Sequence, residues 1–372
     1  MTGIDRRGLL LAAFGLPLVL PGGRSAASAR ATERLIVSAC AQAGGRFAAR
    51  ILAADGGNRR AVVLPGRGHG AAWRAVAREV VVLARRPGRF ALVIDAAEGV
   101  VKQQFEAPST RHFYGHGVFS RDGRWLFTTE NDFEAGRGVI GVYDAAAGYR
   151  REAEIPSYGQ GPHELALLSD GRRLVVANGG IRTHPDSGRR KLNIDTMSPN
   201  LAYIDSGSSA LVRSFDLPAE LHRLSIRHLA VSKDDQVCLA LQNEGPRNRL
   251  VPLVGFQRGD EEIALAETPP AILKDMRHYC GSAALDESGA FLAVSAPRGG
   301  LVTFWALADQ RYLASFAVAD GCGVAAAGGD GRFLISSGQG RLLVYDVVNR
   351  APTMLRGNAA GKLAWDNHLL AL

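Results

Sequence analysis

The fold is decided by residues 115–131, which read GHGVFSRDGRWLFTTEN. Two apolar runs flank a Ser-x-Asp-Gly turn, in which Asp122-Gly123 supplies the positive φ values that a tight turn needs. Apolar runs on the two sides of such a turn pair with each other. The stretch therefore predicts a β-hairpin.

The same hairpin pattern returns four more times along the chain. The repeats are residues 162–178, 227–243, 281–295 and 323–337. Each is followed by a third apolar strand and a shorter fourth one, such as residues 212–217. Four strands in each repeat are typical of a β-propeller blade. Two β-sandwiches would also show regular short strands, but one common hairpin at a near-constant period favours the propeller.

The remaining strands complete a ring. Residues 68–95 fit one further blade, although its first hairpin lacks the Asp-Gly turn. The C-terminal residues 361–372 supply only two strands, and the missing two are available in residues 35–41 and 47–53. The sequence thus predicts an all-β domain over residues 32–372, a seven-bladed propeller of four-stranded antiparallel blades. Pairing of the N- and C-terminal strands closes it and leaves no long exposed sheet edge.

The chain begins with a segment typical of export signals. Arg6-Arg7 precedes an apolar run over residues 9–20, which is too short for a membrane-spanning helix of about 20 residues. Small residues around Ala29 fit a cleavage site. We expect residues 1–31 to be a twin-arginine signal peptide that is removed, and the mature protein to be periplasmic without a stable membrane anchor.

The composition argues against nucleic acid as a partner. The formal net charge is +8, but the arginines are scattered and the chain has no run of five basic residues. Four widely spaced cysteines are too few for a disulfide framework in a domain of this size.

We also expect the protein to be a monomer.

Histidine stands at the start of the first strand in four successive repeats. These residues are His69, His116, His163 and His228. The first strand of each blade lines the centre of a propeller, so the four side chains should crowd around one mouth. Neutral imidazoles that converge on one point are good ligands for a transition metal. The pattern therefore predicts a site for a transition-metal ion.

Other residues near the same mouth could complete the ligand shell. Polar residues end the second strands, and the candidates are Glu130, Asn178, Asn243 and Glu244. Cys280 and Cys322 stand in the corresponding neighbourhoods of the blades that lack histidine. Glu164 follows His163 directly, so strand alternation places it on the opposite side unless it belongs to the turn.

Three alternatives to a histidine metal site follow from the same residues. Arg111, Arg227 and Arg277 stand beside the first strands and would make a basic mouth for an anion such as phosphate or carboxylate. A cation held by the glutamate and asparagine oxygens would make a lactonase-like hydrolase. A protein-interaction scaffold would use the histidines only for packing. The long insert of residues 180–200 reads as a loop over one face, a lid or plain surface.

The leader and the histidine-bearing hairpins, most specifically residues 116–131 and 162–178, carry a resemblance. The chain resembles an uncharacterised family of exported bacterial β-propeller proteins encoded near imelysin-type proteins and a di-haem oxidoreductase in iron-regulated clusters. The resemblance implies a periplasmic role in acquiring iron or another metal, with periplasmic iron-uptake proteins as partners. It assigns no catalytic residue. The mouth also resembles, more distantly, that of copper-bearing propellers, which have more histidines.

Overall fold

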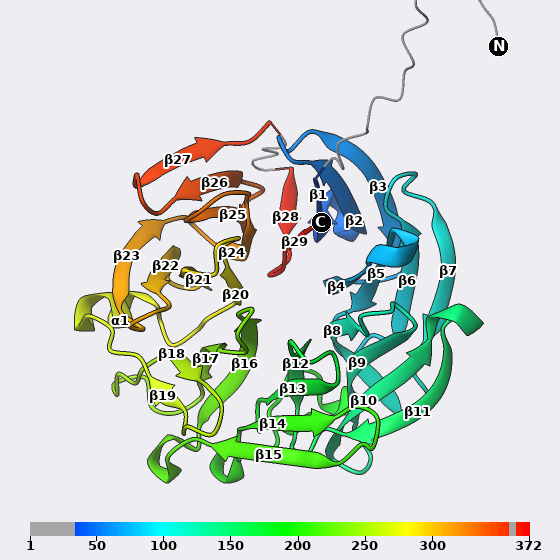
Figure 1. Ribbon diagram of the computed structural model, residues 1–372, viewed down its shortest axis with the longest axis horizontal. Helices are drawn as coiled ribbons and strands as arrows, with labels where there is room; N and C mark the ends of the chain where they lie inside the picture. The colour runs from blue at the N-terminus through cyan, green and yellow to red at the C-terminus, as the bar shows by residue number, and fades with distance from the viewer. Residues whose placement is uncertain (1–33, 357–361) are drawn as a thin grey trace, which may run out of the picture. The chain divides into compact units, whose positions relative to one another are not determined.

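Seven antiparallel sheets surround a common axis in the part of the chain that the structure describes, residues 34–356 and 362–372 (Figure 1). The structure is a computed structural model. It confirms the predicted seven-bladed β-propeller of four-stranded blades. The predicted signal peptide, residues 1–31, lies outside the described residues, as does Gly361. Among the described residues, no helix has the length and apolar character needed to cross a membrane.

Six blades are built from consecutive strands, with the first strand innermost and the last outermost (Figure 1). These strands are β4 (Gly68–Arg74), β5 (Glu79–Ala84), β6 (Phe90–Asp95) and β7 (Val101–Glu106); β8 (Arg111–Phe119), β9 (Trp125–Asp132), β10 (Arg137–Asp144) and β11 (Arg150–Pro156); β12 (Pro162–Leu167), β13 (Arg173–Asn178), β14 (Asn200–Asp205) and β15 (Leu211–Asp216); β16 (Leu224–Val231), β17 (Val237–Asn243), β18 (Val254–Gln257) and β19 (Ala264–Leu265); β20 (Ser282–Leu285), β21 (Phe291–Ala296), β22 (Leu301–Ala306) and β23 (Tyr312–Ala317); and β24 (Gly321–Ala326), β25 (Arg332–Ser337), β26 (Leu342–Asp346) and β27 (Ala351–Met354). The short helix α1 (Pro270–Asp275) lies in the connection before β20.

The repeated turn has the geometry that its sequence dictates. Ser120 accepts a hydrogen bond from the Trp125 backbone N–H at its side-chain oxygen, and Gly123 adopts a φ of 69°. In the β16–β17 turn the residue with positive φ is Asp235, at 63°. Its carboxylate accepts hydrogen bonds from the backbone N–H and hydroxyl of Ser169 in the neighbouring blade, which helps to hold a conformation that a non-glycine residue rarely adopts.

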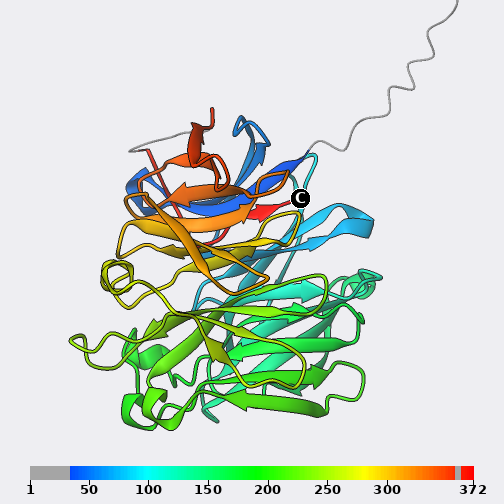
Figure 2. The same ribbon diagram turned by 60° about the vertical axis from the view of Figure 1, so that its left-hand side comes forward.

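Apolar side chains fill the space between neighbouring sheets. In the turned view of Figure 2 these sheets lie against one another. Phe304 of β22 and Phe333 of β25 are both fully buried, and their ring centres are 5.6 Å apart across two blades. Burial of such side chains between sheets is the main force that holds one blade to the next.

The seventh blade joins the two ends of the chain. Its strands are β28 (Leu363–Trp365), β1 (Leu35–Gln42), β2 (Phe47–Ala53) and β3 (Asn58–Leu64), with β29 (Leu370–Ala371) also paired to β1. Cys40 of β1 faces Trp365, and Ile36 faces Ala371. The predicted closure of the ring is therefore confirmed, and it carries the segment between β28 and β29 to the centre of the molecule (Figure 1).

We predict that cysteines at Ala41 and Ala364, which face each other in the antiparallel pair of β1 and β28, form a disulfide on mild oxidation. Directly opposed residues in such a pair have Cα atoms about 4.5–5.5 Å apart, which suits a disulfide. Peptide mass spectrometry would identify the bond. The pair Ala41→Cys and Ala371→Cys is out of register and serves as the control, and equal cross-linking of both pairs would contradict the closure.

Candidate metal centre

The innermost strands carry β-bulges at one level of the propeller. The irregularities fall between residues 68 and 71, 113 and 117, 162 and 164, and 226 and 228. A bulge leaves a residue unpaired and re-aims its side chain. His69, His116 and His163 lie within these bulges and His228 ends one, so each blade turns an imidazole toward the axis.

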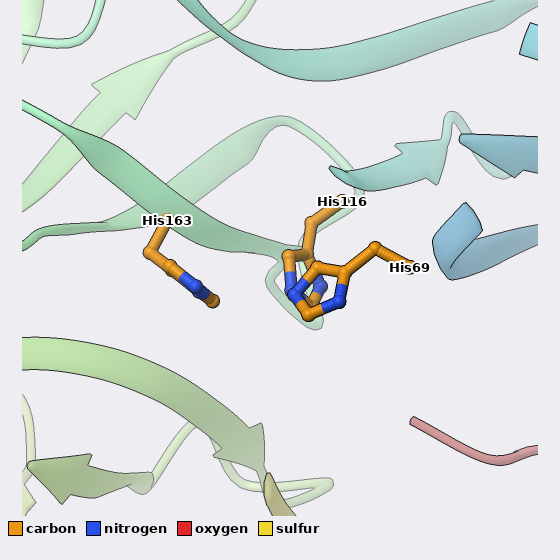
Figure 3. A group of neighbouring side chains, drawn as sticks. All are labelled: His69, His116 and His163. Atoms are coloured by element: carbon orange, nitrogen blue, oxygen red, sulfur yellow. The ribbon is translucent and has the colours of Figure 1, made fainter. Parts of the chain in front are cut away.

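The structure brings these four predicted histidines together and adds a fifth, His368, from the segment that closes the ring. The ring centre of His116 lies 4.4 Å from that of His368, 5.0 Å from that of His163 and 5.1 Å from that of His69. His163 and His228 are 4.5 Å apart. Figure 3 shows His69, His116 and His163 projecting from separate strands into one space. We call these five residues the histidine cluster.

Close approach of neighbouring strands is needed to bring the rings so near. Gly115 adopts a φ of 106°, and a Cβ atom there would lie 2.6 Å from the Cβ of His69. Glycine is therefore required beside His116, because any larger residue would push β4 and β8 apart.

Two overlapping groups of three histidines have the geometry of a metal site. One is His69, His116 and His163, and the other is His116, His228 and His368. In each group the potential ligand nitrogens lie within 4.8 Å of one another. Both groups contain His116, and an imidazole that ligates a metal through its one lone pair can serve one ion, so the two groups would not hold two ions at once.

Two carboxylates lie behind the imidazoles. Asp366 contacts Nδ1 of His69 at 2.8 Å and also pairs with Arg67 at 2.6 Å. Glu164 bridges two blades, with its oxygens 3.0 Å from Nδ1 of His228 and 3.4 Å from Nδ1 of His116. When Nδ1–H donates a hydrogen bond to a carboxylate, Nε2 keeps its lone pair free for a metal, as is usual for ligating histidines.

Burial keeps four rings of the cluster uncharged, those of His69, His163, His228 and His368. It lowers the pKa of His69 to about 3 and that of His228 to about 4, although the carboxylates favour protonation. Burial also lowers the pKa values of His163 and His368 well below the usual range. These four rings are therefore neutral at neutral pH, which is the form that ligates metals.

The carboxylates remain ionised in the same environment. Burial alone would raise the pKa of Glu164, but His116 and His228 hold it below its usual range. Burial likewise opposes ionisation of Asp366, whose pKa is nevertheless lowered by His69 and Arg67. Two fixed negative charges thus stand behind the imidazoles, where they would help to balance the charge of a cation.

Three ring nitrogens of the cluster are buried without a hydrogen-bond partner. They are Nε2 of His116, Nδ1 of His163 and Nε2 of His368. Almost all buried polar atoms in proteins have a partner, so each exception asks for an explanation such as an ion. Three such atoms in one cluster fit a metal ion better than they fit a packing role.

Strand alternation gave the wrong side for Glu164. His163 is an extra residue opposite β13, so the bulge breaks the alternation and Glu164 turns toward the histidine cluster. Asp366 and His368 were not predicted at all. Closure of the ring is the signal that could have found them. β28 takes the innermost place in its blade, as the histidine-bearing strands do in theirs, and Asp366 and His368 follow β28 directly.

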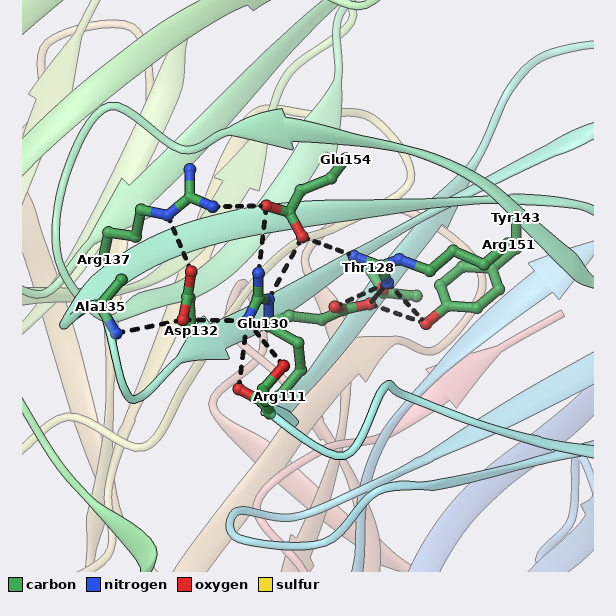
Figure 4. Close-up of polar contacts among 10 residues, drawn as sticks. Arg111, Thr128, Glu130, Asp132, Ala135, Arg137, Tyr143, Arg151 and Glu154 are labelled. Carbon is green, nitrogen blue, oxygen red and sulfur yellow. Dashed lines mark hydrogen bonds and ion pairs between the residues drawn. The ribbon is translucent and has the colours of Figure 1, made fainter.

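Glu130 is buried among polar residues of its own blade (Figure 4) and belongs to neither group of converging histidines. Its carboxylate pairs with Arg151 at 2.7 Å and accepts hydrogen bonds from Thr128 and Tyr143. The neighbouring Arg111 pairs with Asp132 and Glu154 in the same network (Figure 4). Through these contacts, Glu130 and Arg111 join strands of the β8–β11 blade to one another.

Of the other predicted site residues, two asparagines are engaged elsewhere and two charged residues lie beside the cluster. Asn178 donates to the backbone of Ser157, and Asn243 contacts Nδ1 of His278, so the structure places neither in the cluster. Glu244 and Arg227 line a cavity beside the cluster, whereas Arg277 does not.

The cysteine candidates are free and buried. Burial raises the pKa values of Cys280 and Cys322 to about 12, so both are neutral thiols near neutral pH. Neither belongs to the groups of described residues whose ligand atoms converge.

The comparison with protein families identifies the chain. Residues 62–372 match the family described as "Protein of unknown function (DUF1513)". The chain belongs to the DUF1513 family. Membership agrees with the predicted resemblance to an uncharacterised propeller family, while export and genomic neighbourhood stay predictions. No protein among those with curated descriptions matches the chain.

Solved structures with the same fold come from proteins of distant sequence. Hydrazine synthase of Kuenenia stuttgartiensis is 14% identical, with a TM-score of 0.61, over 85% of this chain and 90% of that one. The β-propeller domain of Cps50 (Swd1) from Myceliophteria thermophila is 10% identical, with a TM-score of 0.58, over 81% of this chain and 92% of that one. At these identities the likeness shows the fold alone.

We predict that the metal-free protein loses stability as the pH falls from 6.5 to 5. His69 and His228 have folded pKa values of about 3 and about 4, below the value of about 6.5 in an unfolded chain. The unfolded chain therefore takes up protons in this range that the folded chain refuses, and each histidine adds a slope approaching 1.4 kcal/mol per pH unit. Most carboxylates are still ionised there. Urea unfolding at several pH values would measure this, and a flat profile would contradict the neutral cluster.

We predict that Glu130→Gln lowers the free energy of unfolding by at least about 2 kcal/mol, because it leaves the Arg151 guanidinium without its buried partner. Urea unfolding would measure the change. Glu134→Gln, at an exposed side chain, is the matched control and should have almost no effect. A stable Glu130→Gln protein that loses its metal would instead make Glu130 a ligand.

Proposed function

We propose that this chain is a periplasmic protein that binds one transition-metal ion, iron or copper, at the histidine cluster and acts in acquiring or handling that metal. The observation that carries the proposal is the set of three buried, unpartnered nitrogens on His116, His163 and His368. A packing role would pair these atoms with neighbours, whereas a metal ion held by either group of three histidines would use two of these three residues.

The donor set supports a transition metal. It consists of imidazole nitrogens, with carboxylates placed to accept from Nδ1 rather than to face the centre. Imidazole suits iron, copper, zinc and nickel, whereas calcium and magnesium prefer oxygen ligands. A bound ion would supply positive charge and Lewis acidity. The chain's own part would be to hold the imidazoles neutral and oriented and to limit the access of water.

The hydrolase alternative depends on oxygen ligands that lie elsewhere. Glu130 is engaged by Arg151, Asn178 by the backbone, and Asn243 by His278, while Glu244 alone lies beside the cluster. The histidine geometry therefore favours metal binding over a lactonase-like reaction.

The place of action and the partners belong to the same proposal. The twin-arginine pattern at Arg6-Arg7 supports export to the periplasm, by a route whose clients usually fold before they cross. Periplasmic iron-uptake proteins are the proposed partners, and the resemblance described above supports them.

We predict that the protein, exported through its own pathway and purified, holds close to one metal ion per chain by elemental analysis. The variant His116→Ala with His163→Ala should lose that metal, because it removes one or two ligands from both groups of three. His222→Ala, outside the cluster, is the matched control and should keep the metal. Glu164→Gln should weaken metal affinity about 10- to 100-fold through its loss of orientation of His116 and His228.

Circular dichroism would check that each variant is folded. Absence of metal from the wild-type protein, even after incubation with iron, copper and zinc, would overturn the metal proposal and leave the scaffold alternative.

A further inference from the structure

A basic cavity lies directly beside the histidine cluster. It has a volume of about 260 Å³. His69, His163 and His228 form part of its wall. The cationic side chains around it come from several blades and from the insert between β13 and β14, and they are Arg85, Arg86, Arg189, Lys191, Arg227 and Arg298. We call it the basic cavity.

Most of these cations have no carboxylate of the described residues in direct contact with them. Among the described residues that line the cavity, Glu244 is the single carboxylate, and Lys191 pairs with it. No ion pair or side-chain hydrogen bond in the described part of the chain joins Arg85, Arg86 or Arg227 to a carboxylate. Converging cations without counter-charges repel one another, so the cavity favours an anion.

Arg227 is the residue that ties the cavity to the cluster. It is the extra residue of the bulge before His228, and its Nε atom is buried without a hydrogen-bond partner. Burial and the nearby Arg86 lower the pKa of Arg227 to about 10, so it still carries its charge at neutral pH. One bulge thus places an imidazole in the cluster and an unpartnered guanidinium in the basic cavity.

The insert over the cavity is held in place by its own hydrogen bonds. Asn193 accepts from the backbone N–H of Arg182 at 2.7 Å and donates to the carbonyl of Gly180 at 2.9 Å. These bonds fix the loop that carries Arg189 and Lys191, so the basic residues are arranged before a ligand arrives.

A second hollow adjoins the basic cavity. It has a volume of about 530 Å³ and shares Arg85, Arg86 and Arg189 with the basic cavity. Arg67 also lines it. An anion entering here would therefore meet arginines along its path before it reached the histidines.

We infer that the basic cavity binds a small multivalent oxyanion, a di- or tricarboxylate or a phosphate, which places one oxygen beside the metal held by the histidine cluster. The cavity holds about nine waters at ~30 Å³ each, which matches a small organic acid rather than a nucleotide or a peptide. Arginine forks recognise carboxylate and phosphate oxygens in pairs, and the same oxygens are good ligands for ferric or cupric ions. The role of the anion at the metal rests on the proposed function, whereas its binding to the arginines does not.

The first measurement is calorimetric titration of the metal-free protein with citrate, with inorganic phosphate and with acetate. We expect citrate or phosphate to bind, acetate not to bind, and the affinity to fall as sodium chloride is added. The stronger of the two binding anions identifies the ligand class. Loss of two charge-assisted contacts in Arg85→Gln with Arg227→Gln should weaken binding about 10- to 100-fold.

Two further variants keep the test decisive. Arg277→Gln lies outside the basic cavity and should bind as the wild-type protein does. Arg189→Gln changes an exposed residue of the insert, so it should fold normally and still weaken binding, even if the double variant does not fold. Equal affinity in the wild-type, Arg189→Gln and double-variant proteins, or no binding of either multivalent anion, would overturn the inference.

The second measurement uses copper-loaded protein and follows its visible absorption as the anion is added. A spectral change in the wild-type and Arg277→Gln proteins, absent from Arg85→Gln with Arg227→Gln, is the expected result, with metal retention checked after desalting. An unchanged spectrum despite anion binding would overturn the contact with the metal. If no metal binds but the anion does, the proposed function fails and the anion site stands.

Discussion

Pairing between the two ends of the chain is the constraint on which the rest of the structure depends. β1 is held on one side by β2 and on the other by β28 and β29, so the last residues of the chain complete the seventh blade. Without that pairing the ring would have two open sheet edges. The same pairing carries Asp366 and His368 to the axis, where they meet His69 from the following blade.

At the centre of the molecule, the cost of burying ionisable groups is offset by keeping rings neutral and by contacts between carboxylates and rings. Burial of ionisable groups is costly, and in the cluster four imidazoles stay neutral while the carboxylates of Asp366 and Glu164 contact ring nitrogens. Glu164 is the clearest case, because it contacts histidines of two other blades at once. Its carboxylate therefore fixes ring orientation and the spacing of three blades together.

The sequence contained most of the fold because the information for it is local. A tight turn between apolar runs, as at Asp122-Gly123, predicts one hairpin, and repetition of the same pattern along the chain predicts the propeller. The four histidines were visible for the same reason, since each stands at one place in a repeat. Side-chain direction near a bulge is different, because the extra residue at His163 changes which side Glu164 faces and leaves no signal in the local pattern.

Features assembled from distant segments could not be read in this way. Arg85, Arg189 and Arg227 belong to different connections and strands, and only the closed ring brings them around one cavity. Glu130, by contrast, had a suitable position at the end of a strand, but Arg151 in the same blade captures its carboxylate. A carboxylate that the sequence offers as a metal ligand can instead pair with a nearby arginine, and the folded geometry decides which partner it has.

The span of the histidine cluster has a consequence for folding. Its members run from His69 to His368, so the five imidazoles come together only after contacts across almost the whole chain have formed. Such long-range contacts form late and slowly, because closing large loops is entropically unfavourable. A partly assembled ring would offer incomplete coordination, and a ligand that binds only the native state adds to its stability alone. Metal occupancy would then distinguish finished molecules from unfinished ones, and the centre of this propeller would act as a check on completed assembly.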